Sequence, residues 1–275
     1  MKHMDNRNTL YALEAAGLQA GYAEKLIIEN LDLAVPAGMV TVIIGPNGCG
    51  KSTLLKSIGR ILKPQSGSVL LEGEDLFRMP SREAARKLAI LPQSPKAPQG
   101  MTIFDLVKYG RFPYRKGIGV KINPDDEKII NWALDATQLS EIAGSGLESL
   151  SGGQRQRAWI AMALAQQTQV ILLDEPTTYL DISYQLEIME LLSRLNKERG
   201  YTIIMVLHDL NLASRFADYM IAMREGKIVV SGTPDQVITR QMLRDVFNID
   251  AEIIKDKYTG KPCFAAYRLL RNEDQ

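Results

Sequence analysis

The nine residues that decide the fold of this chain read Gly45-Pro46-Asn47-Gly48-Cys49-Gly50-Lys51-Ser52-Thr53. They match the pattern G-x-x-x-x-G-K-[ST], which is typical of a phosphate-binding loop. Residues 40–44 before the loop are an apolar run typical of a buried strand, and residues 52–58 after it carry apolar side chains on one helical face. The sequence therefore predicts a strand, a glycine loop and a helix in direct succession, rather than a fortuitous glycine turn.

This order of elements predicts an anion site. Gly48 and Gly50 permit backbone angles and a close approach that a Cβ atom would prevent. Successive N–H groups then point inward, with the positive end of the helix behind them. We expect the loop to hold the phosphates of a nucleotide, with Lys51 reaching the β- and γ-phosphates and the Ser52 hydroxyl binding Mg²⁺. Cys49 is interpreted as a small neutral filler of the loop rather than as a redox switch.

The composition is ordinary for a folded protein of 275 residues, with 45% apolar and 24% charged residues. A net charge of +1 gives no reason to expect a nucleic-acid-binding surface from overall charge. No apolar run approaches the ~18–20 residues that cross a bilayer, and the stretch MKHMDNRNTL lacks the apolar centre of a signal peptide. We therefore expect a cytosolic protein that touches a membrane only through a partner. The two cysteines, Cys49 and Cys263, have no metal-type spacing and do not suggest a disulfide framework.

Strand and helix signals divide the chain into an α/β core and a helical insert. Before residue 93, strands are expected at 11–18, 26–33, 40–44, 68–71 and 88–91, with Gly17 and Gly21 as turn residues and a helix at 81–87. Residues 93–165 carry no convincing strand signal, but their apolar residues recur at helical spacing. The core then resumes with strands at 170–173 and 202–207, a helix at about 183–199, and a hairpin whose turn is 224–226. Residues from about 247 onward are expected to form a short strand-bearing extension.

Two acidic residues directly follow the apolar strand 170–173. Asp174 and Glu175 stand at its carboxyl end, and in parallel sheets this edge also carries the phosphate loop. We expect Asp174 to hold Mg²⁺ through a water, and Glu175 to orient or deprotonate the water that attacks the γ-phosphate. The alternative is a solvated acid pair that caps the strand, which the phosphate loop in the same chain disfavours.

For two other side chains, the sequence is compatible with either a functional or a structural role. His208 comes where the apolar strand 203–207 ends, and the other histidine, His3, lies in the N-terminal tail. His208 is either a structural hydrogen-bond donor or a group that reaches the γ-phosphate and holds the attacking water in line. Tyr22, in a turn before the phosphate loop, is either an ordinary turn aromatic or a platform on which adenine stacks.

A second anion site is predicted at Ser151-Gly152-Gly153-Gln154, before a helix that runs to about residue 167. Exposed N–H groups, a serine hydroxyl and the helix dipole all face one way there. The helical insert should displace this helix sideways, so that Ser151 does not reach Lys51 of its own chain. The simplest solution is a head-to-tail dimer in which each Ser151 loop covers the ATP of the other chain. A plain helix cap is the alternative.

These motifs together resemble the ATP-binding subunits of ABC transporters. The loop at 45–53 is similar to the family's Walker A motif, LPQ at 91–93 to its Q-loop, LSGGQ at 150–154 to its signature motif, ILLDEP at 171–176 to Walker B, and His208 to its switch histidine. The resemblance implies one α/β ABC ATPase domain across 1–275. Its parts would be a RecA-like P-loop NTPase core with an antiparallel β subdomain at 1–92 and 166–246, a helical subdomain at 93–165, and a short extension at 247–275.

The resemblance also implies roles for individual residues. Tyr22 matches the aromatic residue that stacks on adenine, and Asp181 matches the acid of the D-loop, which communicates across the dimer. Gln93 matches the residue that senses Mg²⁺ and the γ-phosphate while linking to the membrane subunit. With Glu175 as general base and His208 as switch histidine, these residues complete a site for ATP and Mg²⁺.

Two stretches resemble a narrower group, the importers of ferric siderophores, with haem and cobalamin importers as near relatives. They are residues 177–187, TTYLDISYQLE, and residues 110–114, GRFPY. In the first, Thr178 replaces the usual D-loop serine and keeps its hydroxyl, so we expect little functional change.

The implied partners follow from this resemblance. They are a second copy of the chain, polytopic membrane permease subunits contacted through the helical subdomain, and indirectly an extracytoplasmic substrate-binding protein. The implied location is the cytoplasmic face of the membrane, without a nucleic acid partner. One rival class is a soluble ABC-type ATPase of DNA repair or translation, which a single domain without heptads disfavours. Another is a non-enzymatic nucleotide-binding scaffold, which intact Glu175 and His208 disfavour.

Overall fold

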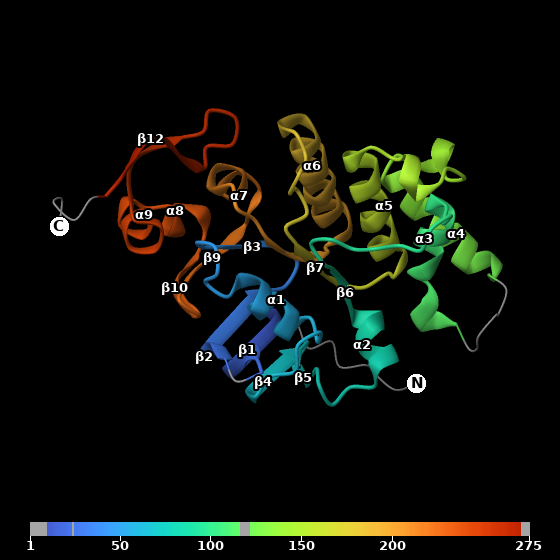
Figure 1. The fold of residues 1–275 in the computed structure, drawn as a ribbon, viewed down its shortest axis with the longest axis horizontal. Helices are drawn as coiled ribbons and strands as arrows, with labels where there is room; N and C mark the ends of the chain where they lie inside the picture. The colour runs from blue at the N-terminus through green and yellow to red at the C-terminus, as the bar shows by residue number, and fades with distance from the viewer. Residues whose placement is uncertain (1–9, 24, 116–121, 271–275) are drawn as a thin grey trace.

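The computed structural model describes residues 10–23, 25–115 and 122–270. The first nine residues, which include His3, and the last five residues of the C-terminal extension lie outside them. The described residues form a six-stranded sheet, a four-stranded antiparallel sheet and a two-stranded hairpin. Figure 1 shows the four-stranded sheet and the helical segment on different sides of the six-stranded sheet, with the hairpin near the C-terminus.

The six-stranded sheet has the order β10-β9-β3-β8-β7-β6. Neighbouring strands from β9 to β6 are parallel, and β10 joins β9 as an antiparallel hairpin. The bounds are β3 Val40–Ile44, β6 Leu88–Leu91, β7 Val170–Asp174, β8 Thr202–Val206, β9 Tyr219–Arg224 and β10 Lys227–Gly232. Every residue of β3, β7 and β8 is buried, as expected for parallel strands that are covered on both faces.

Alternate residues of these strands enter two separate cores. Val42 and Ile44 join a core that includes residues of the helical segment, whereas Ile43 joins a core with the antiparallel sheet and the helix after the phosphate loop. The helices that cover the two faces include α1 Lys51–Ile58, α2 Ser81–Lys87, α6 Ile182–Arg199 and α7 Leu210–Phe216. Because both faces are packed, the loops at the carboxyl edge of the sheet are held on a rigid base.

The antiparallel sheet corrects one expectation. Its strands are β1 Tyr11–Tyr22, β2 Lys25–Pro36, β4 Ser66–Leu71 and β5 Glu74–Asp75. Gly17 and Gly21 do not separate strands, because β1 runs through both of them with shifts of register against β2. Gly17 has φ 57° and donates its N–H to Asp32 Oδ1 at 2.8 Å. These glycines therefore mark irregularities within one long strand. In the sequence, a glycine at such an irregularity looks the same as a glycine in a turn.

The segment from 93 to 165 is helical in its described residues, as predicted, and contains one isolated bridge, between Thr102 and Gly146. Its helices are α3 Ile103–Tyr109, α4 Pro124–Ala136 and α5 Gly152–Ala165, with short 3-10 turns at Phe112–Tyr114, Ser140–Ile142 and Leu147–Ser149. Buried Arg111 donates to Asp126 Oδ1 at 2.6 Å and to the carbonyl of Ala165 at 2.8 Å. This arginine joins α4 to α5 and fixes the GRFPY stretch inside the segment.

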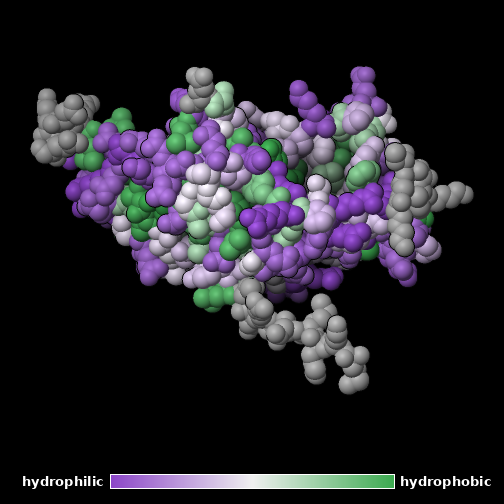
Figure 2. All heavy atoms as spheres, turned by 90° about the horizontal axis from the view of Figure 1, so that it is seen from below, coloured by the Kyte–Doolittle hydropathy of each residue, from purple (hydrophilic) through white to green (hydrophobic). Residues whose placement is uncertain are grey.

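The C-terminal part contains α8 Pro234–Val237, α9 Arg240–Phe247 and a hairpin of β11 Ile249–Lys255 with β12 Pro262–Leu269, which confirms the expected strand-bearing extension. No helix among the described residues is both long and apolar enough to span a membrane. On the face seen in Figure 2, hydrophilic side chains dominate and hydrophobic ones appear in small separate groups.

Candidate functional site

The candidate site lies where three neighbouring parallel strands end. Strand β8 is hydrogen-bonded to β3 on one side and to β7 on the other. The chain leaves β3 into the phosphate loop, leaves β7 at Asp174, and leaves β8 shortly before His208. Because all three strands run the same way, the sheet brings these segments to one edge, where α/β proteins bind their ligands.

The phosphate loop is held tightly at its base and is open at its middle. A Cβ at Gly45 would lie 2.3 Å from the carbonyl oxygen of Met223, so only glycine fits there. Gly48 has φ 76°, and a Cβ there would meet no atom within 4 Å, so its requirement is conformational. The N–H of Gly226, in the β9–β10 turn, donates to the carbonyl of Cys49 at 2.9 Å. This main-chain hydrogen bond thus attaches the phosphate loop to the hairpin of β9 and β10.

Lys51 and Cys49 are both buried in this loop. Lys51 Nζ donates to the carbonyls of Gly45 and Pro46, each at 2.9 Å, so its ammonium lies within the loop. Burial raises the pKa of the Cys49 thiol, and the charge of Lys51 offsets part of that effect. A thiol that burial keeps neutral agrees with its interpretation as a filler.

Ser52 and Asp174 form an oxygen pair beside Lys51. The Ser52 hydroxyl donates to Asp174 Oδ1 at 3.1 Å. Burial raises the pKa of Asp174, and the nearby charge of Glu175 raises it further, whereas the Ser52 hydrogen bond and the charges of Lys56 and Lys51 lower it. A buried carboxylate is costly unless a positive charge compensates it. A hydroxyl next to a carboxylate is a donor set that suits Mg²⁺.

Three side chains converge on the carboxylate of Glu175. Gln93 Nε2 and the Thr178 hydroxyl both donate to Oε2, the latter at 3.0 Å, and His208 Nε2 lies against Oε1. The Glu175 side chain is only 9% exposed, whereas His208 is 44% exposed. Glu175 also has φ 52°, an unfavourable backbone angle for a residue with a Cβ. The structure therefore brings the expected Gln93, Glu175 and His208 together and orients both carboxylate oxygens.

The Ser151 loop is built as a helix start, and in the described residues its own hydrogen bonds form a cap rather than a contact with this cluster. The Ser151 hydroxyl accepts the N–H of Gln154 at 3.2 Å, and Gln154 Oε1 accepts the N–H of Ser151 at 3.0 Å, which forms a capping box for α5. Ser151, Gly152 and Gln154 are exposed, whereas Gly153 is buried. Within the described residues, no hydrogen bond or ion pair links this loop to Lys51.

Asp181 and Tyr184 connect the stretch 177–187 to the Ser151 loop. Asp181 Oδ1 accepts the N–H groups of Ser183 and Tyr184, each at 3.1 Å, and so caps α6. A Cβ at Gly153 would lie 2.6 Å from Tyr184 Cδ1, so the tyrosine ring packs directly on that glycine. The capped start of α6 thereby supports the start of α5.

Tyr22 lies beside helix α1. It ends strand β1, is 47% exposed, and has Lys56 Nζ 5.9 Å from its ring centroid. Lys56 is four residues after Ser52, so the ring is near the phosphate loop. A partly exposed aromatic ring in this position is available for stacking.

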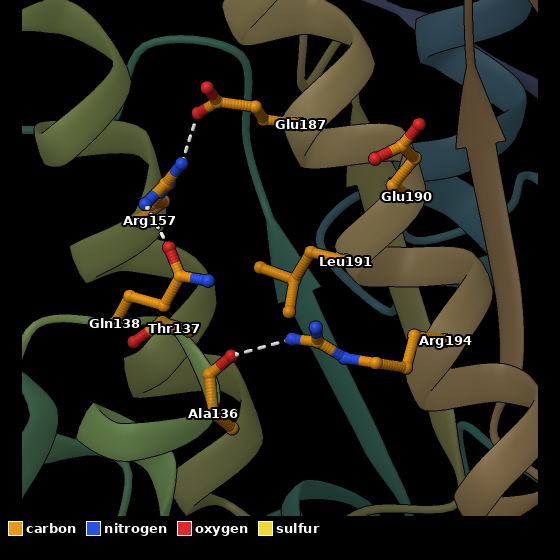
Figure 3. A pocket seen from close by; sticks show the side chains of 8 residues that line it. All are labelled: Ala136, Thr137, Gln138, Arg157, Glu187, Glu190, Leu191 and Arg194. Carbon is orange, nitrogen blue, oxygen red and sulfur yellow. Dashed lines mark hydrogen bonds and ion pairs between the residues drawn. The ribbon is translucent and has the colours of Figure 1, made fainter.

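A separate cleft of about 240 Å³ lies between the end of α4, α5 and α6 and contains none of the expected site residues (Figure 3). Arg157 bonds to Gln138 Oε1 at 3.0 Å and to Glu187, and Arg194 donates to the carbonyl of Ala136 at 3.2 Å (Figure 3). These bonds connect the helical segment to α6.

Sequence reasoning missed two contacts of this site. It noted Thr178 as a D-loop residue but not as a partner of Glu175; the available signal was a hydroxyl three residues after the acid. It also missed Tyr184 as the support of Gly153, for which the sequence offered no signal.

A protein family and a curated protein match this chain over much of its length. The family described as "ABC transporter" matches residues 28–178. The iron(3+)-hydroxamate import ATP-binding protein FhuC of Bacillus subtilis (strain 168) is 51% identical over 264 residues, covering 96% of this chain and 98% of that protein.

Solved structures are also similar. CbiO1 from Clostridium perfringens, part of the ABC transporter complex CbiONQ, has a TM-score of 0.74 and 29% identity, covering 86% of this chain and 93% of that one. The ATP-binding cassette MJ0796 was solved as a dimer in a post-hydrolysis state bound to ADP and Pi. It has a TM-score of 0.70 and 29% identity, and the match covers 80% of this chain and 98% of that one.

Proposed function

The chain belongs to the ABC transporter family as an ATP-binding subunit with ATPase activity, and from this premise we propose that it powers the import of ferric siderophores. The observation that supports a catalytic role for Glu175 is the convergence of Gln93, Thr178 and His208 on its carboxylate. The cargo is supported by the iron-hydroxamate import protein that is 51% identical over nearly the whole chain. We also propose the division into a core at 1–92 and 166–246, a helical subdomain at 93–165 and an extension at 247–275.

Membership of this family shows that the chain binds ATP, and we propose which of its residues contact the nucleotide. Tyr22 stacks on adenine, and the N–H groups of the loop 45–53 with the Lys51 ammonium hold the β- and γ-phosphates. Ser52 and Asp174, with Gln93 nearby, would hold Mg²⁺, which neutralises charge on the β- and γ-phosphate oxygens. Occupation by a cation would favour the ionised form of Asp174, whose pKa burial otherwise raises.

Glu175 is the general base in this proposal. Its Oε2 is held by Gln93 and Thr178, and its Oε1 faces His208, so the carboxylate has a fixed direction. It accepts a proton from the water that attacks the γ-phosphate, while His208 holds that water in line. The rigid base of the parallel sheet keeps these groups in register with the loop that binds the phosphates.

A second copy of the chain completes the site. Ser151 and Gln154 are exposed and, among the described residues, share no hydrogen bond with Lys51, so they are available to contact a nucleotide held by another chain. The dimeric cassette MJ0796 supports this arrangement. In the same proposal Asp181 communicates across the dimer, and the helical subdomain contacts polytopic permease subunits at the cytoplasmic face of the membrane. An extracytoplasmic substrate-binding protein would deliver the cargo.

The test of the catalytic assignment is Glu175→Gln. It should leave ATP affinity intact, lower kcat by at least about 100-fold, and trap a dimer in the presence of ATP, as seen by size-exclusion chromatography with light scattering. The matched control is Glu190→Gln on α6, a glutamate in the separate cleft, which should behave like the parent. ATP hydrolysis near the parent rate in Glu175→Gln would refute the general-base assignment.

The cargo is tested separately by growth of a deletion strain on single iron sources. Growth defects confined to ferric siderophores support the proposal. A defect on haem, or in cobalamin uptake, with normal siderophore use would assign the chain to one of those importers instead.

A further inference from the structure

The C-terminal hairpin is bonded to helix α7, which starts two residues after His208. Asn211, in the first turn of α7, bonds to both main-chain polar groups of Phe264 on β12. Its Nδ2 donates to the carbonyl of Phe264 at 3.1 Å, and its Oδ1 accepts the N–H of Phe264 at 3.0 Å. The asparagine amide therefore pairs with β12 as a neighbouring strand would.

Two further bonds follow along α7. The buried Ser214 hydroxyl donates to the carbonyl of Pro262, and Lys261 Nζ donates to the carbonyl of Ala217, which caps the end of the helix. The hairpin thus contacts the start, the middle and the end of this helix. A helix of seven residues is too short to be stable by itself, so its position depends on what surrounds it.

The hairpin is itself anchored to a second helix. Asp250 on β11 accepts from Arg240 Nε at 2.8 Å and from Arg244 Nη2 at 2.9 Å, both on α9. Its side chain is 11% exposed. Because the hairpin is fixed to α9 at its base, its bonds to α7 restrain that helix relative to the rest of the chain.

The start of α7 sets the direction of the chain at His208. Asp209 caps the helix by accepting the N–H of Leu212 at 2.8 Å, and Asn211 lies in the same turn. His208 is 44% exposed, so its own packing restrains it only in part. A displacement of about 1 Å in a catalytic group can lower a rate by about 100-fold.

We propose that Asn211 is a positioning residue for ATP hydrolysis, through which the C-terminal hairpin holds α7 and keeps His208 against Glu175. This inference rests on the roles proposed above for Glu175 and His208. It gives the hairpin of β11 and β12 a role in ATP hydrolysis that requires no contact with the nucleotide.

The test measures ATP hydrolysis by the full-length chain with single and double variants. Asn211→Ala should lower kcat about three- to tenfold and leave KM for ATP within about twofold. Asn211→Asp has nearly equal volume but loses the donor to the Phe264 carbonyl, so it should also lower kcat. In a His208→Ala background, Asn211→Ala should have less than about a twofold further effect, because it acts through that histidine.

The matched control is Asn196→Ala. The Asn196 amide donates to the carbonyls of Gly38 and Tyr201 at 2.8 and 2.6 Å, remote from His208. Its loss should lower the melting temperature without changing kcat per folded molecule. Full additivity of Asn211→Ala with His208→Ala, or an unchanged kcat in both Asn211 variants, would overturn the positioning role alone. An unchanged kcat in His208→Ala would overturn the role of His208 and this inference with it.

Discussion

Thr178 donates its hydroxyl to Glu175 Oε2 at 3.0 Å, which connects the D-loop to the carboxylate at the end of β7. The bond fixes one oxygen of the proposed general base and leaves the other to face His208. A residue that was singled out in the sequence only as a replacement for serine is therefore part of the site.

Replacing Thr178 tests this bond. Thr178→Val keeps the shape but removes the hydroxyl, so kcat should fall about three- to tenfold with KM for ATP unchanged, because the carboxylate loses a restraint used in the transition state. Thr178→Ser restores the donor and should act like the parent. Equal kcat values in steady-state assays of the valine and serine variants would mean that the hydroxyl has no role in turnover.

Tyr22 should contribute to nucleotide affinity through its ring and not through its hydroxyl. Stacking of a base on an aromatic ring is worth about 1–3 kcal/mol, so Tyr22→Ala should raise Kd for ATP by roughly tenfold. Tyr22→Phe should leave it unchanged. Titration calorimetry measures both, with Tyr258→Ala, an exposed tyrosine on the C-terminal hairpin, as the control. Parent-like affinity in Tyr22→Ala would remove the stacking assignment.

Gly153 should not tolerate a side chain while Tyr184 is in place. A Cβ there would lie 2.6 Å from the tyrosine ring, and such overpacking costs about 1–3 kcal/mol of unfolding free energy. Gly153→Ala should therefore lower the melting temperature and shift the start of α5. Adding Tyr184→Ala makes room and should recover most of the loss. If thermal unfolding shows the two changes to be additive, the ring does not impose the glycine.

The anchor of the C-terminal hairpin should depend on pH through Asp250. Hydrogen bonds from Arg240 and then Arg244 lower the pKa of this carboxyl below its usual value. Because Asp250 has a lower pKa in the folded chain than in the unfolded chain, its ionised carboxylate stabilises the folded state. This stabilisation is present above the unfolded pKa of about 3.9 and is lost as the pH falls through the lowered folded value. Asp250→Asn should thus lower the melting temperature at neutral pH.

This difference from the parent should disappear in strongly acidic solution, where the parent carboxyl is protonated as well. Thermal unfolding of both proteins across the acidic range checks the sign. A difference that stays constant at all pH values would show that the ionised carboxylate is not what stabilises the hairpin.

The sequence by itself determined the parts of the protein that depend on contiguous residues. The loop at 45–53, the mostly apolar strands around it, and Asp174 and Glu175 at a strand end were readable because strand and helix periods and glycine loops are local patterns. Their arrangement at one edge of the sheet could also be predicted, since the carboxyl ends of parallel strands lie at the same edge. The helical character of the described residues in 93–165 and the strands of the C-terminal extension were predicted in the same way and are confirmed.

Only the tertiary structure decided which distant side chains meet. Gly17 was expected in a turn but lies within β1, because the pairing with β2 accommodates an irregular residue. Asn211 meets Phe264 across 53 residues, and Tyr184 packs on Gly153, through contacts between separately packed elements. Such contacts depend on how far and at what angle whole elements pack, and short-range patterns of hydrophobicity do not encode those distances.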